Sequence, residues 1–242
     1  MSEEKKEHKH SAVKIIIGVI LTPIAIFLVL IILLYAGYLL EQNRQIADGS
    51  YLQIAEKKPA NGLKISGYTE VEKRLIEGID NHSIGSDNPK VTIVQFSDFA
   101  CPFCRVSFPV LREISIKYAE DVKIIFRDWP GHDESIDLAM AAYCAGEQGK
   151  FWEMHDMIFQ NYSDALGKDK NNLAILAERL GVYNEKFQTC FDEKKYLQQI
   201  RQNYLDSKTL GVVGTPTWFI NGRKVEGALT IQDLTKLIEN SL

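Results

Sequence analysis

Residues 91–104 read VTIVQFSDFACPFC, and this stretch decides the fold of the chain around it. Residues 91–96 are mostly apolar and rich in β-branched side chains, as in a buried strand. Residues 105–118 then carry apolar side chains at helical spacing. The sequence therefore predicts that Cys101 and Cys104 lie where a strand meets a helix, at or near the first helical turn.

Two thiols at a helix N-terminus are suited to disulfide exchange. The first turn of a helix has N–H groups without backbone partners and the positive end of the helix dipole, and both favour a thiolate. A thiolate is the nucleophile of disulfide exchange, and Cys104 is placed to close a disulfide with Cys101. Cys-x-x-Cys is also half of a zinc site, but the chain has no second Cys-x-x-Cys or His-x₃-His pair, so we expect no metal site.

The composition indicates one domain of ordinary size together with a membrane segment. The chain has 242 residues and a formal net charge of −4 at pH 7, and its basic residues form no long run. This balance argues against a nucleic-acid partner. The chain has four cysteines, and their meaning depends on the compartment in which the protein works.

The compartment is indicated by the N-terminal region. Residues 15–40 contain no charged side chain and are dominated by Ile, Leu and Val. A membrane-spanning helix takes about 20 apolar residues, whereas a cleaved signal peptide has an apolar region of about 7–15 and a small-residue site, which is missing here. Lysines precede the segment and only Arg44 follows it closely, so the positive-inside rule places the N-terminus in the cytoplasm. We expect a cytoplasmic tail (1–14), a transmembrane anchor (15–40), a stalk with a short helix (41–81) and an extracytoplasmic domain (82–242).

The rest of the chain alternates between strand and helix patterns. Residues 122–126 predict a second strand, and residues 133–209 have helical spacing throughout. Residues 217–226 predict a hairpin around Asn221-Gly222, followed by a helix over 231–238. Strands from both ends of this region must share one sheet, so we expect an α/β fold with an inserted helical block at about 133–209.

Three stretches carry a resemblance to a known family: FSDFACPFC at 96–104, AAYCAGEQGKFWEMHD at 141–156 and GVVGTPTWFING at 211–222. Together they resemble the DsbA-like thiol–disulfide oxidoreductases, which have a thioredoxin fold with a helical insertion. The resemblance covers residues 82 to 242, and the combination of Cys-x-x-Cys with the later Thr215-Pro216 is specific.

The resemblance implies a role for each residue of these motifs. Cys101 is the nucleophile and Cys104 is the resolving thiol. The substrate peptide is expected to contact Pro102, Phe103, Thr215 and Pro216, with Pro216 in the cis form facing the cysteines. No cofactor is implied apart from the redox-active disulfide of Cys101 and Cys104.

The chain departs from familiar relatives in two places. Phe103 stands where strong oxidants carry a histidine, and it offers the Cys101 thiolate neither a positive charge nor a hydrogen bond. Gln95 stands where many relatives carry a buried acid, and an amide cannot accept a proton from Cys104. Because of Phe103 we expect an oxidant that is weaker than those relatives.

The remaining polar candidates have simpler interpretations. Cys144 and Cys190 lie in the helical block, either as buried free thiols or as a disulfide that stabilises the block by roughly 2–4 kcal/mol, and the resemblance favours the disulfide. His132 and His155 are expected on the surface or in the core. Arg127-Asp128, at the end of a strand, is expected to form an ion pair.

The function implied by the resemblance is disulfide donation to folding extracytoplasmic proteins that carry thiols. Reoxidation would then need a membrane thiol oxidase of the DsbB or vitamin-K-epoxide-reductase type. Two alternatives stay open from the sequence: the same fold working as a reductase or isomerase, and a peptide-binding, chaperone-like module. The Phe103 and Gln95 departures keep the first alternative open.

Overall fold

The computed structural model describes residues 27–34, 37, 69–167 and 171–242. The chain divides into two compact units, residues 1–57 and 58–242. In the first unit, residues 27–34 form a helix with exposed apolar side chains. No helix within the described residues is both long enough and apolar enough to cross a membrane. Most of the expected anchor (15–40), and the expected stalk before residue 69, lie outside the described residues.

The second unit is built on one sheet of five strands in the order β1-β3-β2-β4-β5. The strands are β1 (Ser83–Gly85), β2 (Val91–Ser97), β3 (Val122–Asp128), β4 (Thr217–Ile220) and β5 (Arg223–Glu226). Strands β2 and β3 are parallel, and every other neighbouring pair is antiparallel. The prediction of one sheet formed from both ends of the domain is therefore confirmed. The sequence analysis does not predict strand β1, because its three residues are too few to show a strand period.

The alternating side chains of the sheet supply two separate cores. Ile93 on β2 faces helices α5 (Pro102–Lys117) and α12 (Ile231–Glu239), whereas Val94 beside it packs with Ile76 of helix α4 (Glu70–Glu77). Because successive side chains of a strand point to opposite faces, an apolar run such as β2 is stable only when both faces are covered. The full burial of Ile93 and Val94 shows that both faces are covered here.

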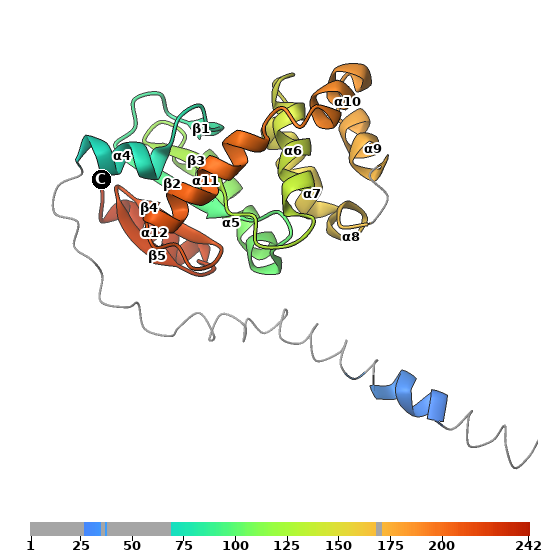
Figure 1. The fold of residues 1–242 in the computed structure, drawn as a ribbon. Helices are drawn as coiled ribbons and strands as arrows, with labels where there is room; N and C mark the ends of the chain where they lie inside the picture. The colour runs from blue at the N-terminus through green and yellow to red at the C-terminus, as the bar shows by residue number, and fades with distance from the viewer. Residues whose placement is uncertain (1–26, 35–36, 38–68, 168–170) are drawn as a thin grey trace, which may run out of the picture. The chain divides into compact units, whose positions relative to one another are not determined.

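The helical block lies beyond one end of the sheet, as Figure 1 shows. It consists of α6 (Ser135–Gly146), α7 (Phe151–Gln160), α8 (Tyr162–Ala165), α9 (Asn171–Arg179) and α10 (Asn184–Asp192). Helix α11 (Leu197–Thr209) then leads back to the sheet and contacts both β3 and α4. The block has a core of its own that also includes Phe99, Cys101 and Cys104, so the cysteine pair lies where the block meets the sheet.

Arg127 and Asp128 do not form the ion pair that the sequence predicts, because successive residues of a strand point to opposite faces. The buried guanidinium of Arg127 lies 2.5 Å from Asp206 of α11 and donates to the backbone carbonyl of Ile76 at the end of α4. The carboxylate of Asp128 instead accepts a hydrogen bond from Tyr143 of α6. Arg127 therefore fastens α4 and α11 to the sheet, while Asp128 fastens the helical block.

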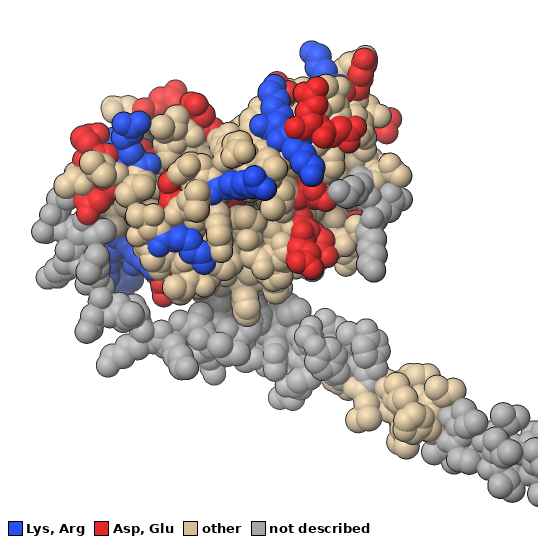
Figure 2. Space-filling view, in the orientation of Figure 1, with Lys and Arg blue, Asp and Glu red and all other residues tan. Residues whose placement is uncertain are grey.

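On the face drawn in Figure 2, the basic and acidic side chains of the described residues are interspersed rather than gathered into one area of a single sign. Much of this face is uncharged.

Candidate active site

Cys101 is the N-cap residue of α5, and Pro102 begins the helix. The chain leaves β2 at Ser97 and turns through residues 98–100 before it reaches Cys101. Asp98 closes this turn: its side chain accepts a hydrogen bond from the N–H of Ala100 at 2.9 Å, and its carbonyl accepts one from the N–H of Cys101 at 3.0 Å. Proline is favoured at the first position of a helix, because it needs no N–H partner and its φ already matches the helix.

The surroundings of Cys101 favour a thiolate. Its pKa is lowered from the ordinary 9.0 to about 6, mainly because the thiol of Cys104 donates a hydrogen bond to it, with help from the N–H groups of Phe103 and Cys104. Burial acts in the opposite direction, since it disfavours a charge. Cys101 is only 5% exposed in this reduced state, in which both cysteines are free.

Cys104 has the opposite character. It is 1% exposed, and burial raises its pKa well above the ordinary value, as does the neighbouring negative charge of Cys101. The N–H of Asp98 lies 3.4 Å from its sulfur. The two cysteines therefore differ sharply: Cys101 is ready to ionise, and Cys104 holds its proton and donates it in a hydrogen bond.

The Thr215–Pro216 peptide bond is cis. This segment precedes β4, and the carbonyl of Pro216 accepts a hydrogen bond from the N–H of Gly227 at 2.9 Å. The carbonyl oxygen of Thr215 lies 3.5 Å from the sulfur of Cys101. The structure thus brings together Cys101, Cys104, Thr215 and Pro216, which are far apart in the sequence.

The two departures that the sequence shows have different structural consequences. Phe103 projects from the first turn of α5 with 45% of its surface exposed, beside the cysteines but without any polar group to offer them. Gln95 is 1% exposed on β2, and its amide nitrogen has no hydrogen-bond partner among the described residues. Around the cysteines and elsewhere in the described chain, no three His, Cys, Asp or Glu side chains gather as a metal site.

Sequence reasoning missed two side chains that contact the cysteine turn from other elements. His132, in the loop between β3 and α6, lies with its Nδ1 atom 2.6 Å from Asp98. Tyr162 of α8 donates a hydrogen bond of 2.5 Å to the carbonyl of Ala100. Neither residue has a fixed spacing from Cys101, and both depend on how the helical block folds back, so no local pattern could have shown them.

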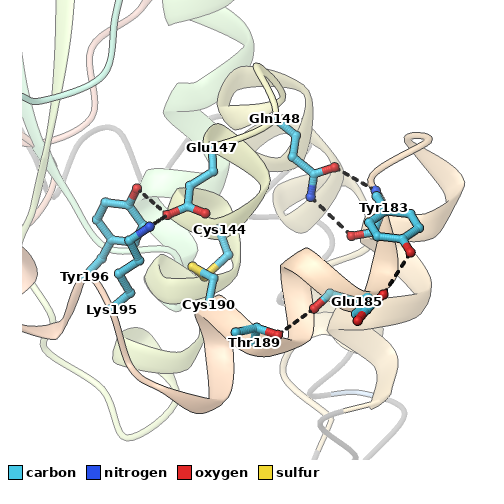
Figure 3. The surroundings of a disulfide bond; sticks show 9 residues. All are labelled: Cys144, Glu147, Gln148, Tyr183, Glu185, Thr189, Cys190, Lys195 and Tyr196. Atoms are coloured by element: carbon cyan, nitrogen blue, oxygen red, sulfur yellow. Dashed lines mark hydrogen bonds and ion pairs between the residues drawn. A yellow bond between two sulfur atoms is a disulfide. The ribbon is translucent and has the colours of Figure 1, made fainter.

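Cys144 of α6 and Cys190 of α10 form a disulfide with a sequence separation of 46 (Figure 3). Both cysteines are buried. Beside them, the carboxylate of Glu147 pairs with Lys195 and accepts a hydrogen bond from the hydroxyl of Tyr196 at 2.9 Å. The disulfide therefore joins two helices of the block and leaves Cys101 and Cys104 as free thiols.

The fold and the dithiol define the class of the domain: a thioredoxin-fold domain with an inserted helical block and a Cys-x-x-Cys pair at a helix N-terminus. A family model described as Thioredoxin matches residues 78–240. The chain therefore belongs to the thioredoxin family.

Solved structures similar to this chain include one described as a thiol–disulfide exchange protein. The thiol–disulfide exchange protein alpha-DsbA2 from Wolbachia pipientis is 22% identical, with a TM-score of 0.63 over 70% of this chain and 91% of that one. BdbD from Bacillus subtilis is 21% identical, with a TM-score of 0.59 over 66% of this chain and 92% of that one. The catalytic domain of Proteus mirabilis ScsC is 22% identical, with a TM-score of 0.62 over 71% of this chain and 94% of that one. At these identities the likeness concerns the fold.

The curated proteins that resemble this chain in sequence are named as Na(+)/H(+) antiporters. The Na(+)/H(+) antiporter NhaA 3 of Salinispora tropica is 32% identical over 161 residues, which are 65% of this chain and 24% of that protein. The corresponding antiporter NhaA 1 of Salinispora arenicola is 30% identical over 164 residues, 66% of this chain and again 24% of that protein. The chain spans about a quarter of the length of the curated relatives it matches.

Proposed function

We propose that the chain is an extracytoplasmic protein thiol–disulfide oxidoreductase that donates the Cys101–Cys104 disulfide to folding proteins. The observation that carries this proposal is the contrast between the two thiols, with the pKa of Cys101 lowered to about 6 and that of Cys104 raised. A protein that stabilises one thiolate stabilises its reduced form, and so it gives up its disulfide readily.

The exchange proceeds in two balanced steps. A substrate thiolate attacks the sulfur of Cys101, the Cys101–Cys104 bond breaks, and Cys104 leaves and takes up a proton. A second substrate thiolate then attacks the substrate sulfur of the mixed disulfide, and Cys101 leaves as a thiolate. The substrate has lost two electrons and gained a disulfide, and the enzyme is left reduced, with Cys101 as the thiolate and Cys104 as the thiol.

The substrate peptide is proposed to lie along Thr215 and Pro216, with Phe103 and Pro102 beside it. The carbonyl of Thr215 lies within 3.5 Å of the Cys101 sulfur, so a peptide that pairs with this backbone would bring its own sulfur to the reacting atom. The exposed ring of Phe103 would supply apolar contact.

The proposed location is the outer side of a membrane, with residues 15–40 as the anchor and residues 1–14 in the cytoplasm. Support comes from the uncharged character of residues 15–40 and from the lysines that precede them. A membrane thiol oxidase of the DsbB or vitamin-K-epoxide-reductase type is the proposed source of oxidising equivalents, and an anchored chain would meet it by diffusion in the bilayer.

The test is the reduction potential of Cys101–Cys104 in the purified chain, equilibrated with glutathione, together with oxidation of a reduced, unfolded protein. A potential toward about −120 mV and stoichiometric oxidation of the substrate support donation. A potential toward about −270 mV makes the chain a reductase. Activity that survives Cys101→Ser contradicts both disulfide donation and reduction by this thiol. Mixed disulfides trapped in the Cys104→Ser variant would instead support exchange at Cys101.

A further inference from the structure

The carboxylate of Asp98 joins the turn that carries Cys101 to the loop between β3 and α6. Asp98 is 2% exposed and immediately follows β2. One carboxylate oxygen accepts the N–H of Ala100 at 2.9 Å, and the other accepts the N–H of Gly131 at 3.0 Å. The same second oxygen lies 2.6 Å from Nδ1 of His132. A single buried carboxylate thus binds both the turn that leads to Cys101 and the imidazole of His132.

The loop between β3 and α6 comes close to Asp98 at Gly131. A Cβ atom at Gly131 would lie 2.4 Å from the ring of Trp129 and 3.3 Å from the Asp98 carboxylate, so a side chain at this position would force the Trp129 ring to shift. The imidazole of His132 is about half exposed, at 48%, while the Asp98 carboxyl group beneath it is fully covered. The ring is therefore held by the carboxylate through Nδ1 and stays partly open to solvent.

The charges around His132 are consistent with an imidazolium near Cys101. The pKa of His132 is raised above 6.5, mainly by its hydrogen bond to Asp98, and the negative charges of Cys101 and Glu134 raise it further, while burial opposes them. Coupling between two titrating groups is reciprocal, so a charge on Cys101 that favours protonation of His132 is itself favoured by that protonation.

We propose that Asp98 and His132 are a positioning pair that supplies the Cys101 thiolate with the positive charge that Phe103 cannot supply. Asp98 orients the imidazole and fixes the Cys101 turn, and His132 acts on Cys101 through the electrostatic field. This inference rests on Cys101 being the reacting thiol of the proposed function. It assigns the tuning of that thiol to a loop next to the helical block rather than to a residue between the cysteines.

The pair matters most for Cys101 as a leaving group. When a substrate thiolate resolves the mixed disulfide, the sulfur of Cys101 takes the electron pair of the broken bond, and a nearby imidazolium stabilises that charge. The pKa of Cys101 is lowered to about 6 and that of His132 is raised, so thiolate and imidazolium coexist from about pH 6 until His132 loses its proton.

The test compares His132→Gln with His132→Lys in the full chain. Glutamine keeps a neutral donor for Asp98 but has no charge, whereas lysine keeps the charge without the imidazole. We expect His132→Gln to raise the pKa of Cys101 by about half a unit, which is roughly a threefold shift in its ionisation equilibrium. The reduction potential should fall by about 15 mV, the same threefold factor at about 30 mV per factor of ten. His132→Lys should recover most of both changes.

The readouts are the pH dependence of thiolate absorbance in the reduced protein and the glutathione equilibrium constant. His82→Gln is the matched control, because His82 stacks on Phe151 and its pKa, lowered to about 4 by burial, leaves it uncharged at neutral pH. It should leave the pKa of Cys101 unchanged. A purely structural role for His132 would give the opposite pattern, in which glutamine is tolerated and lysine is not, and that pattern would overturn the proposal.

Asp98→Asn adds a second arm. Because the carboxyl group is buried, this variant is used only if its unfolding transition matches that of the original chain. We expect it to lower the pKa of His132 toward the ordinary 6.5, as followed by NMR, since it loses the acid that holds the imidazolium; an unchanged pKa of His132 would contradict the positioning role of Asp98. These pKa measurements need no substrate, so an unchanged pKa of Cys101 in His132→Gln refutes the pair, whereas oxidation of a reduced protein that survives Cys101→Ser refutes the proposed function instead.

Discussion

The hydrogen bond from Cys104 to Cys101 can be removed by one substitution, Cys104→Ala. This bond is the largest cause that lowers the pKa of Cys101 to about 6, which corresponds to roughly 90% thiolate at pH 7. A hydrogen bond to a charged group contributes about 1.5–3 kcal/mol, and one pKa unit is about 1.4 kcal/mol. We therefore expect the pKa of Cys101 to rise by about one to two units in Cys104→Ala. At pH 7 about half of the Cys101 side chains, or fewer, would then be thiolate.

The assay is a titration of thiolate absorbance, with Cys101→Ser as the blank. Cys104→Ser is the matched control, because its hydroxyl can still donate to Cys101 and its pKa should stay near the original value. Equal pKa values in the alanine and serine variants would refute the assignment of Cys104 as the donor. A value of 8.5 or higher in the unmodified chain, about that of a free thiol, would refute the whole account of the site.

The same shift makes the stability of the reduced form depend on pH. The pKa of Cys101 is lower in the folded protein than in the unfolded chain, so ionisation of Cys101 stabilises the folded, reduced state. This contribution is complete above the ordinary pKa of 9.0 and is lost as the pH falls through about 6. The oxidised protein has no Cys101 thiol and should lack this dependence, which urea unfolding of both forms across this range would show.

Three further predictions concern the framework of the site. Replacing Cys144 and Cys190 by alanine opens a loop with a sequence separation of 46, for which chain entropy gives about 4 kcal/mol, so the urea midpoint should fall while the pKa of Cys101 stays the same. The pKa of Asp128 is raised from 3.8 to about 6 by burial, so it favours the folded state below pH 4 and this contribution is lost as the pH rises through 6. Asp128→Asn should remove that part of the pH dependence of unfolding, and an unchanged profile would contradict it. Tyr162→Phe removes the hydrogen bond to Ala100 and should lower the unfolding free energy by about 1 kcal/mol, with faster amide exchange in the Cys101 turn as the check.

Local patterns in the sequence predicted the central features of the fold. The apolar run before Cys101 gave β2, and the helical spacing after it gave α5, because both periods are set by backbone geometry within a few residues. The Asn221-Gly222 turn predicted the β4–β5 hairpin in the same way, and Asn221 has the positive φ of 44° that such a turn needs. The short edge strand β1 was missed, since three residues carry no usable period and pair only with the distant β3.

The sequence by itself determined which atoms can react: two thiols, spaced to form a disulfide, at the start of a helix. Only the tertiary structure decided how they differ. Cys104 is buried and holds its proton, Thr215 is brought to the sulfur of Cys101, and Asp98 meets His132 across a gap of 34 positions. The physical reason is that hydrogen bonding and burial depend on distance in space, whereas the periods that reveal strands and helices depend on distance along the chain.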